Sequence, residues 1–291
     1  MNYRELTAAL TPLHGAGEAR AIVRLVMEER FGLSQTDLLL GKDTALSAND
    51  REEMEKIASR LLSGEPVQYV LGFSDFCGHR FRVTPDVLIP RPETEELTRL
   101  AIAENLQSSN NLLDLCTGSG CIATSLALAF PKAYVVGVDV SEAALAIARE
   151  NATSLGAENV EFVRQDVLSS QFSVRALSIV PSEPPNFQLL VSNPPYVRES
   201  EAAGMSSTVL DHEPHLALFV PDADPLLFYR TIAHIARQVL YPGGLLLFEV
   251  NQALGNQTCQ LLEQLGFDDV SLRKDQFGRP RMVRATWPSS D

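Results

Sequence analysis

A glycine-rich loop between a strand-like segment and a helix-like segment is the feature that most constrains the fold. Residues 111–115 are apolar enough for a buried strand, residues 116–121 read Cys-Thr-Gly-Ser-Gly-Cys, and residues 122–130 form an apolar helical stretch. Glycines after a strand and before a helix let the backbone approach a ligand closely. Strand and helix patterns keep alternating beyond this point, which predicts an α/β fold with a doubly wound, mostly parallel sheet.

Acidic residues lie near the ends of the next two predicted strands. The segment 134–140 contains Asp139, about twenty residues beyond the loop, where a carboxylate can accept hydrogen bonds from both hydroxyls of a ribose. Ser141 is then expected to cap a helix that runs to about residue 154. The third strand, 160–165, is followed by Asp166, which can accept from an adenine amino group. These positions predict a nucleoside site at the carboxyl edge of the sheet.

The tetrapeptide Asn193-Pro194-Pro195-Tyr196 follows a further predicted strand, 187–192. The prolines end that strand because they cannot donate to a ladder. The Asn193 side-chain oxygen and the Pro194 carbonyl can accept both N–H bonds of one planar NH2 group, and Tyr196 can stack on its plane. The segment therefore suits the binding of an amide or aromatic amine nitrogen. A simple strand-ending turn is the alternative, since Asn and Pro are turn residues.

The glycine loop by itself leaves two cofactor classes open. Gly118-x-Gly120-x-x-Ala123, with Asp139, also fits the dinucleotide fingerprint. Asp114 favours S-adenosylmethionine, because its carboxylate could meet a methionine ammonium and would repel a pyrophosphate. The Asn-Pro-Pro-Tyr segment points the same way, since it has no obvious use in hydride transfer.

The order of these motifs resembles class I methyltransferases that modify amino nitrogens. Three more segments narrow the match: Glu-Pro-Val-Gln-Tyr-Val-Leu-Gly at 65–72, Leu-Ile-Pro-Arg-Pro-Glu-Thr-Glu at 88–95 and Glu-Pro-His-Leu-Ala-Leu at 213–218. With them the chain is similar, over about residues 60–287, to the bacterial peptide chain release factor glutamine N5-methyltransferases. This resemblance implies a Rossmann-like fold with a seven-stranded sheet, S-adenosylmethionine as cofactor, and a release factor methylated on the glutamine of a Gly-Gly-Gln motif.

The residues and the resemblance together give a candidate site without a metal. Catalysis is assigned to Asn193, Pro194 and Tyr196, and substrate binding to these three and Pro195. From the residues alone, Arg91 and Thr94 favour helix-start chemistry; the resemblance instead places them against the cofactor. The cofactor-binding set is Asp114, Cys116, Thr117, Gly118, Ser119, Gly120, Asp139, Asp166, Val167, Asn193, Arg91 and Thr94.

Two departures from the family pattern stand out. Cys116 takes a position where many members have glycine, so that position is expected to need less backbone freedom. The connection 169–186 is longer than usual. Glu249 either faces the site or is a buried partner of an Arg or Lys, and the pair His212-x-x-His215 is expected to be a polar loop because a zinc site needs a third ligand.

The net charge of the chain limits the classes of partner that it is expected to bind. The formal net charge of −13 and the pI of about 4.9 argue against non-specific nucleic-acid binding, and they favour a basic protein partner. Methylation of adenine N6 in DNA or RNA is the rival activity, and a non-enzymatic cofactor-binding or ribosome-associated factor is the rival class. Four scattered cysteines, with no signal peptide or membrane-spanning stretch, predict a cytoplasmic protein, expected to be a monomer.

Three domains are expected along the chain. Residues 1–64 read as a helical substrate-docking domain, 65–90 as a β-hairpin linker and 91–291 as the methyltransferase domain. Outside the motifs, helices are predicted at 18–31, from Ser47 onward, from Pro92 onward, at 225–240 and at 254–265. A strand is predicted at 245–250, after a Pro-Gly-Gly segment that ends the preceding helix. Residues 268–274 and 281–287 are predicted to form a hairpin.

Overall fold

The computed structural model describes residues 1–104, 111–177 and 186–289, and the chain divides into two compact units. The first unit contains residues 1–73 and 205–212, and the second contains residues 74–204 and 213–291. The expected α/β architecture with a mostly parallel seven-stranded sheet is confirmed in the second unit.

The first unit is built from helices around an apolar core. They are α1 (Tyr3–Phe31), α2 (Gln35–Leu39), α3 (Ala48–Leu62), α4 (Val67–Leu71) and α8 (Ser207–His212), with a 3₁₀ turn at Lys42–Ala45. Ser47 caps α3 as predicted, because its hydroxyl accepts from the Asp50 amide. The helix predicted from residue 18 starts much earlier, at Tyr3, and Gly15 with φ of 76° breaks its helical geometry.

The core of this unit extends past residue 64. Val67, Val70 and Leu71 are buried together with Leu6, Met27 and other residues of α1 and α3. The structure therefore differs from the predicted boundary: residues 67–71 are a helix packed into the first unit, and only 73–82 form the hairpin of the expected linker. A five-residue apolar segment is too short to show the helical repeat of apolar residues, so the sequence pattern suggested a strand here.

The central sheet has the strand order β10-β11-β9-β6-β3-β4-β5. Its strands are β3 (Asn111–Leu115), β4 (Tyr134–Asp139), β5 (Val160–Arg164), β6 (Phe187–Ser192), β9 (Leu240–Glu249), β10 (Asp268–Lys274) and β11 (Pro280–Thr286). Neighbours from β9 to β5 are parallel, whereas β11 is antiparallel to both β9 and β10. The carboxyl ends of β3, β4, β5, β6 and β9 consequently share one edge.

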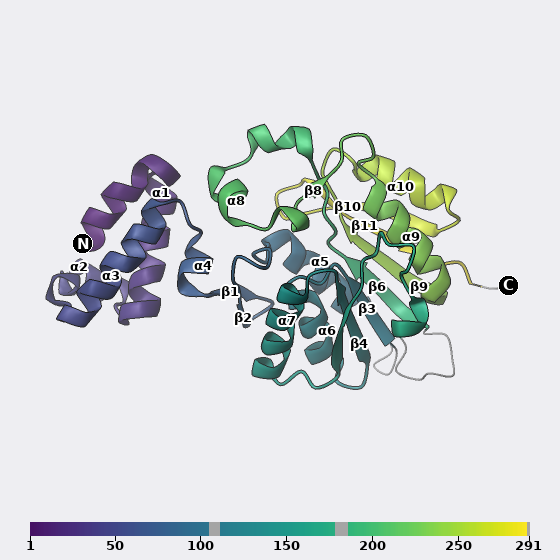
Figure 1. Ribbon diagram of the computed structural model, residues 1–291, viewed down its shortest axis with the longest axis horizontal. Coiled ribbons are helices and arrows are strands. Elements are labelled where there is room, and N and C mark those ends of the chain that lie inside the picture. Colours follow the sequence, from purple (N-terminus) through teal and green to yellow (C-terminus); the bar gives the residue numbers. More distant parts are fainter. Residues whose placement is uncertain (105–110, 178–185, 290–291) are drawn as a thin grey trace. The chain divides into compact units, whose positions relative to one another are not determined.

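Helices cover both faces of the sheet (Figure 1). α5 (Pro92–Ala103), α6 (Cys121–Ala129) and α7 (Glu142–Leu155) cover one face, and α9 (Leu227–Val239) and α10 (Gly255–Gln264) cover the other. Side-chain alternation along β3 explains the two cores, because Leu112 is buried under the first group of helices and Leu113 under the second. Pro92 starts α5 and Ser141 caps α7, as predicted.

Shorter elements complete the second unit. β1 (Phe73–Phe76) pairs with β2 (His79–Arg82), β7 (Val197–Arg198) pairs in parallel with β8 (Phe219–Val220), and 3₁₀ turns lie at Val174–Leu177, Glu199–Gly204 and His215–Ala217. The Pro-Gly-Gly stop expected before the strand at 245 is instead part of β9, where the register with β6 shifts between Leu240 and Leu245. Residues 178–185 of the long 169–186 connection lie outside the described residues.

None of the helices among the described residues is long and apolar enough to cross a membrane.

Candidate active site

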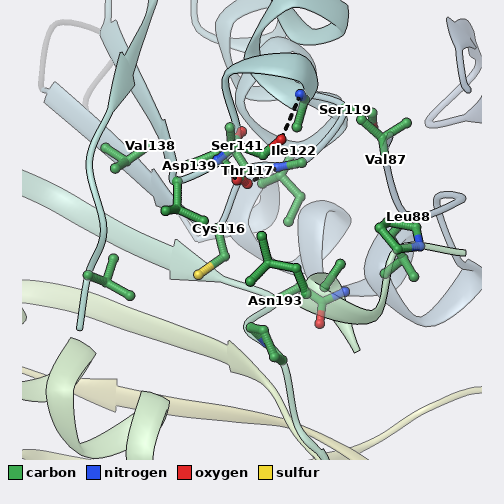
Figure 2. A pocket seen from close by; sticks show the side chains of 18 of the residues that line it. Val87, Leu88, Cys116, Thr117, Ser119, Ile122, Val138, Asp139, Ser141 and Asn193 are labelled. Carbon is green, nitrogen blue, oxygen red and sulfur yellow. Dashed lines mark hydrogen bonds between the residues drawn. The ribbon is translucent and has the colours of Figure 1, made fainter. Parts of the chain in front are cut away.

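A cavity of about 250 Å³ lies at the shared carboxyl edge of the strands. Residues that follow β3, β4, β5 and β6 line it, together with the segment before α5 and the segment around Leu216. Figure 2 shows Leu88, Asp139 and Asn193 among the side chains that line it. Of the predicted cofactor residues, the lining includes Cys116, Thr117, Gly118, Ser119, Asp139, Asp166, Val167, Asn193 and Thr94. Asp114, Gly120 and Arg91 are not part of this lining.

Asp139 fastens the glycine loop to the start of α7. Its Oδ2 accepts from the Gly118 amide at 2.9 Å, and its Oδ1 accepts from the Ser141 amide, also at 2.9 Å. Each carboxylate oxygen has a further lone pair. Burial raises the pKa of Asp139, and the two backbone N–H bonds oppose that shift. The carboxylate is thus held at the end of β4, where a ribose hydroxyl can reach the remaining lone pairs.

The loop backbone is left-handed at three positions. φ is 64° at Cys116, 54° at Gly118 and 74° at Gly120. The expectation that position 116 needs less backbone freedom is therefore wrong, since a side chain there is held in a conformation that favours glycine. Burial also raises the pKa of the Cys116 thiol well above its ordinary value, so this residue is a neutral packing group at pH 7.

Asp114 lies beneath the loop. Its side chain is fully buried, and its Oδ2 accepts from the Thr117 hydroxyl at 2.5 Å and from the Ala123 amide at 3.2 Å. Among the described residues, its Oδ1 has no hydrogen-bond partner. Burial raises the pKa of Asp114 to about 7. The carboxyl group therefore joins the loop to the first turn of α6, and one oxygen is left over for a donor.

Asp166 and Val167 line the cavity after β5. Asp166 Oδ1 accepts from the Leu168 amide at 2.8 Å, so the carboxylate is turned into a tight bend of its own segment. Its other oxygen is available to a ligand donor such as an amino group. Together with Asp139 and the glycine loop that lines the same cavity, these residues fit an adenosine-containing cofactor.

The Asn-Pro-Pro-Tyr segment contributes only part of its length to the cavity. Asn193 and Pro195 line it, whereas Pro194 and Tyr196 do not. The Asn193 Nδ2 donates to the Thr94 hydroxyl at 3.0 Å, and that hydroxyl donates to Glu249 Oε2 at 2.6 Å. Tyr196 donates its hydroxyl to Glu249 Oε1 at 2.9 Å. Glu249 is 1% exposed, and its hydrogen-bonding partners are these two hydroxyls rather than an Arg or Lys.

Arg91 is engaged outside the cavity. Its guanidinium pairs with Glu213, whose other oxygen accepts from the Ile89 amide at 3.3 Å. This pair ties the segment before α5 to the segment after Glu213, and both segments line the cavity through Pro90 and Pro214. Arg91 therefore supports the cavity wall in this structure.

Other lining residues were not among the predicted site residues. They are Asp86, Val87, Leu88, Pro90, Cys121, Ile122, Val138, Val140, Ser141, Ala144, Gln165, Leu168, Pro214, Leu216, Ala217 and Phe228. The segments 88–95 and 213–218 carried the family resemblance, which was a signal for a shared site. Within the described ranges, no group of three or more His, Cys, Asp or Glu side chains is arranged to hold a metal.

Comparison with known proteins decides the family. A model described as a methyltransferase domain matches residues 106–264, and one described as a PrmC N-terminal domain matches residues 4–72. The release factor glutamine methyltransferase of Bacteroides thetaiotaomicron is 46% identical over 277 residues, which cover 95% of this chain and 96% of that protein. The chain belongs to the release factor glutamine methyltransferase family. The member from Flavobacterium psychrophilum is 40% identical over 291 residues and 98% of each chain.

Two solved structures are similar to this chain. The release factor-specific protein-(glutamine-N5) methyltransferase of Alicyclobacillus acidocaldarius is 30% identical, and the match covers 72% of this chain and 99% of that one with a TM-score of 0.42. A methyltransferase of Pyrococcus furiosus is 16% identical and has a TM-score of 0.50 over 84% of this chain and 100% of that one, a likeness of fold alone. The fold of the Pyrococcus furiosus protein agrees with the predicted methyltransferase fold.

Proposed function

We propose that this enzyme transfers a methyl group from S-adenosylmethionine to the side-chain amide nitrogen of the glutamine in the Gly-Gly-Gln motif of peptide chain release factors. One observation carries the proposal: Asn193, an acceptor suited to an amide NH2 group, lines the same cavity as the glycine loop and Asp139. Family membership supports the same reaction, since relatives carry that activity in their names.

The cofactor would be held by residues of three strand ends. Asp139 would accept from the ribose hydroxyls, and Asp166 with Val167 would border the adenine. Asp114 remains a predicted partner of the methionine ammonium, and its buried Oδ1 is the atom that such a contact would use. When bound, S-adenosylmethionine supplies an electrophilic methyl group on a sulfonium.

The substrate would be oriented by Asn193 and Pro194. An amide nitrogen is a poor nucleophile because its lone pair is delocalised into the carbonyl. If the Asn193 Oδ1 and the Pro194 carbonyl accept its two N–H bonds, the nitrogen is held in line with the methyl group. These acceptors help most in the transition state, where the nitrogen becomes cationic. Positioning and electrostatics of this kind are worth several kcal/mol. No strong general base is needed, because the proton can leave afterwards.

The first unit is proposed to dock the release factor, in a monomeric enzyme of the cytoplasm that does not act on nucleic acid. Its helices carry none of the cavity residues, and a protein substrate needs one glutamine to be selected on a folded surface. The formal net charge of −13 would attract a basic partner. A variant lacking residues 1–73 should lose activity on the intact release factor much more than on a short Gly-Gly-Gln peptide. Equal losses on both substrates would contradict docking.

A transfer assay tests the activity. The purified enzyme is incubated with S-adenosylmethionine labelled in its methyl group and with release factor, DNA, RNA or no acceptor. The proposal expects label in the release factor alone. Label in DNA or RNA would instead identify an adenine methyltransferase, and cofactor binding without transfer to any acceptor would identify a binding factor.

A further inference from the structure

The hydrogen bonds around Asn193 run in one direction. The Thr94 hydroxyl has a single proton, which it donates to Glu249 Oε2 at 2.6 Å. Burial raises the pKa of Glu249, and the hydrogen bonds that it accepts from the Thr94 and Tyr196 hydroxyls oppose that shift. With its proton committed, the Thr94 oxygen can only accept from Asn193, and it does so from Nδ2 at 3.0 Å.

This direction decides which end of the Asn193 amide is free. An amide group has an NH2 end that only donates and an oxygen end that only accepts. Because Thr94 takes the NH2 end, the Oδ1 end is left for a ligand in the cavity that Asn193 lines. The reverse orientation would present a donor to the target nitrogen, which has no acceptor to offer while its lone pair attacks the methyl group.

The fold fixes the carboxylate that starts this chain of bonds. Glu249 is the last residue of β9, next to Phe248, which is in register with Ser192 at the end of β6. The Asn-Pro-Pro-Tyr segment begins directly after Ser192, so Glu249 lies beside it. Its second oxygen accepts from Tyr196. Both ends of the tetrapeptide are therefore attached to one buried carboxylate, Asn193 through Thr94 and Tyr196 directly.

We propose that Thr94, itself oriented by Glu249, is a positioning residue that holds the Asn193 amide with its oxygen toward the substrate nitrogen. This inference rests on the proposed function for its substrate. It gives Thr94 a role different from the direct cofactor contact expected from the sequence. Thr94 is 3% exposed, and its hydroxyl already has one partner on each side.

Substitutions that change only the hydroxyl test the proposal. Thr94→Val keeps the shape and removes the acceptor, and Thr94→Ser restores it. We expect Thr94→Val to lower kcat on the release factor at least about tenfold, with the Kd for S-adenosylmethionine changed less than about threefold, because the lost interaction acts on the transition state. Thr94→Ser should recover kcat to within about threefold of the original enzyme.

Thr98→Val is the matched control. Thr98 is fully buried one turn further along α5, and its hydroxyl donates to the Thr94 carbonyl at 2.9 Å. The side chain does not contribute to the cavity lining. Its substitution removes a buried hydroxyl from the same helix without touching Asn193, so kcat should stay close to the original value.

A second measurement needs no methyl acceptor and so separates this inference from the proposed function. The side-chain NH2 signal of Asn193, assigned by its loss in Asn193→Ala, is followed by nitrogen NMR. We expect slow exchange of one amide proton in the original enzyme and in Thr94→Ser, and faster exchange in Thr94→Val. Unchanged exchange in Thr94→Val would overturn the proposal, even if the release factor proves not to be the substrate. A Thr94→Val enzyme with normal kcat and weakened cofactor binding would also overturn it and return Thr94 to the cofactor site.

Discussion

Substitution of Gly120 by Ala should destabilise the methyltransferase unit by an amount that the geometry sets. An L side chain at φ of 74° costs about 1–2 kcal/mol. The added Cβ would lie 2.8 Å from the Ala148 Cβ, 3.0 Å from the Phe162 Cζ and 3.1 Å from the Ala148 Cα. Overpacking of this kind costs about 1–3 kcal/mol, and the stiffer unfolded chain returns about 0.4–1 kcal/mol. The free energy of unfolding is therefore expected to fall by about 2–4 kcal/mol in Gly120→Ala.

Gly118→Ala is the control for backbone strain alone. Gly118 also has a left-handed φ, 54°, but an added Cβ would meet no atom within 4 Å. The free energy of unfolding of Gly118→Ala is expected to be lower by about 1 kcal/mol. The difference in unfolding free energy between Gly120→Ala and Gly118→Ala therefore measures the cost of the contact with α7 and β5.

Tryptophan fluorescence during urea unfolding measures both values. The single tryptophan, Trp287, packs against Phe267 with ring centroids 5.1 Å apart, so it reports on the second unit. Equal losses for the two variants, or a Gly120→Ala protein as stable as the original, would refute the reasoning that the loop is packed directly on α7.

Three further substitutions probe the site. Asn193→Ala should lower kcat about 10²–10³-fold with little change in stability, by analogy with the loss of an oxyanion-hole donor; steady-state kinetics near the original rate would remove Asn193 from the mechanism. Asp139→Ala should weaken S-adenosylmethionine binding about 10–150-fold in calorimetric titration, and it should also lower stability because the Gly118 and Ser141 amides lose their acceptor. Burial raises the pKa of Asp114 from 3.8 to about 7. Between these two pH values the folded protein keeps a proton on Asp114 that the unfolded protein has lost. The free energy of unfolding therefore falls as pH rises from about 4 to about 7. The stability of the original protein relative to Asp114→Asn should therefore fall by up to about 1.4 kcal/mol per pH unit between pH 4 and 7 in urea unfolding, and a pH-independent difference would contradict the raised pKa.

Local chemistry explains the parts of the fold that could be predicted. Ser47 and Ser141 cap helices because a serine oxygen satisfies a free amide wherever a helix starts, and the acidic residue that ends β4 lies at the site because parallel strands share a carboxyl edge. The sequence pattern gave wrong element boundaries where the backbone departs from regular geometry. Gly15 breaks the helical geometry inside α1, and β9 continues through Pro242.

The contacts that organise the site were beyond the reach of sequence pattern for another reason. Thr94 and Glu249 are 155 residues apart, and Arg91 and Glu213 are 122 residues apart. No spacing rule links such positions, so the pattern could mark Thr94 and Arg91 as site residues but could not show that each one holds another residue in place. The hydroxyl partners of Glu249 were missed for the same reason, since burial of a carboxylate ordinarily suggests a basic partner.

Peptide mass spectrometry of a release factor treated with this enzyme and S-adenosylmethionine tests the central claim most directly. The account predicts one added methyl group on the Gly-Gly-Gln glutamine, on its side-chain nitrogen, and none when Asn193→Ala replaces the original enzyme. An unmodified glutamine after treatment with a folded, cofactor-binding enzyme, or a methyl group on a different residue, would contradict it.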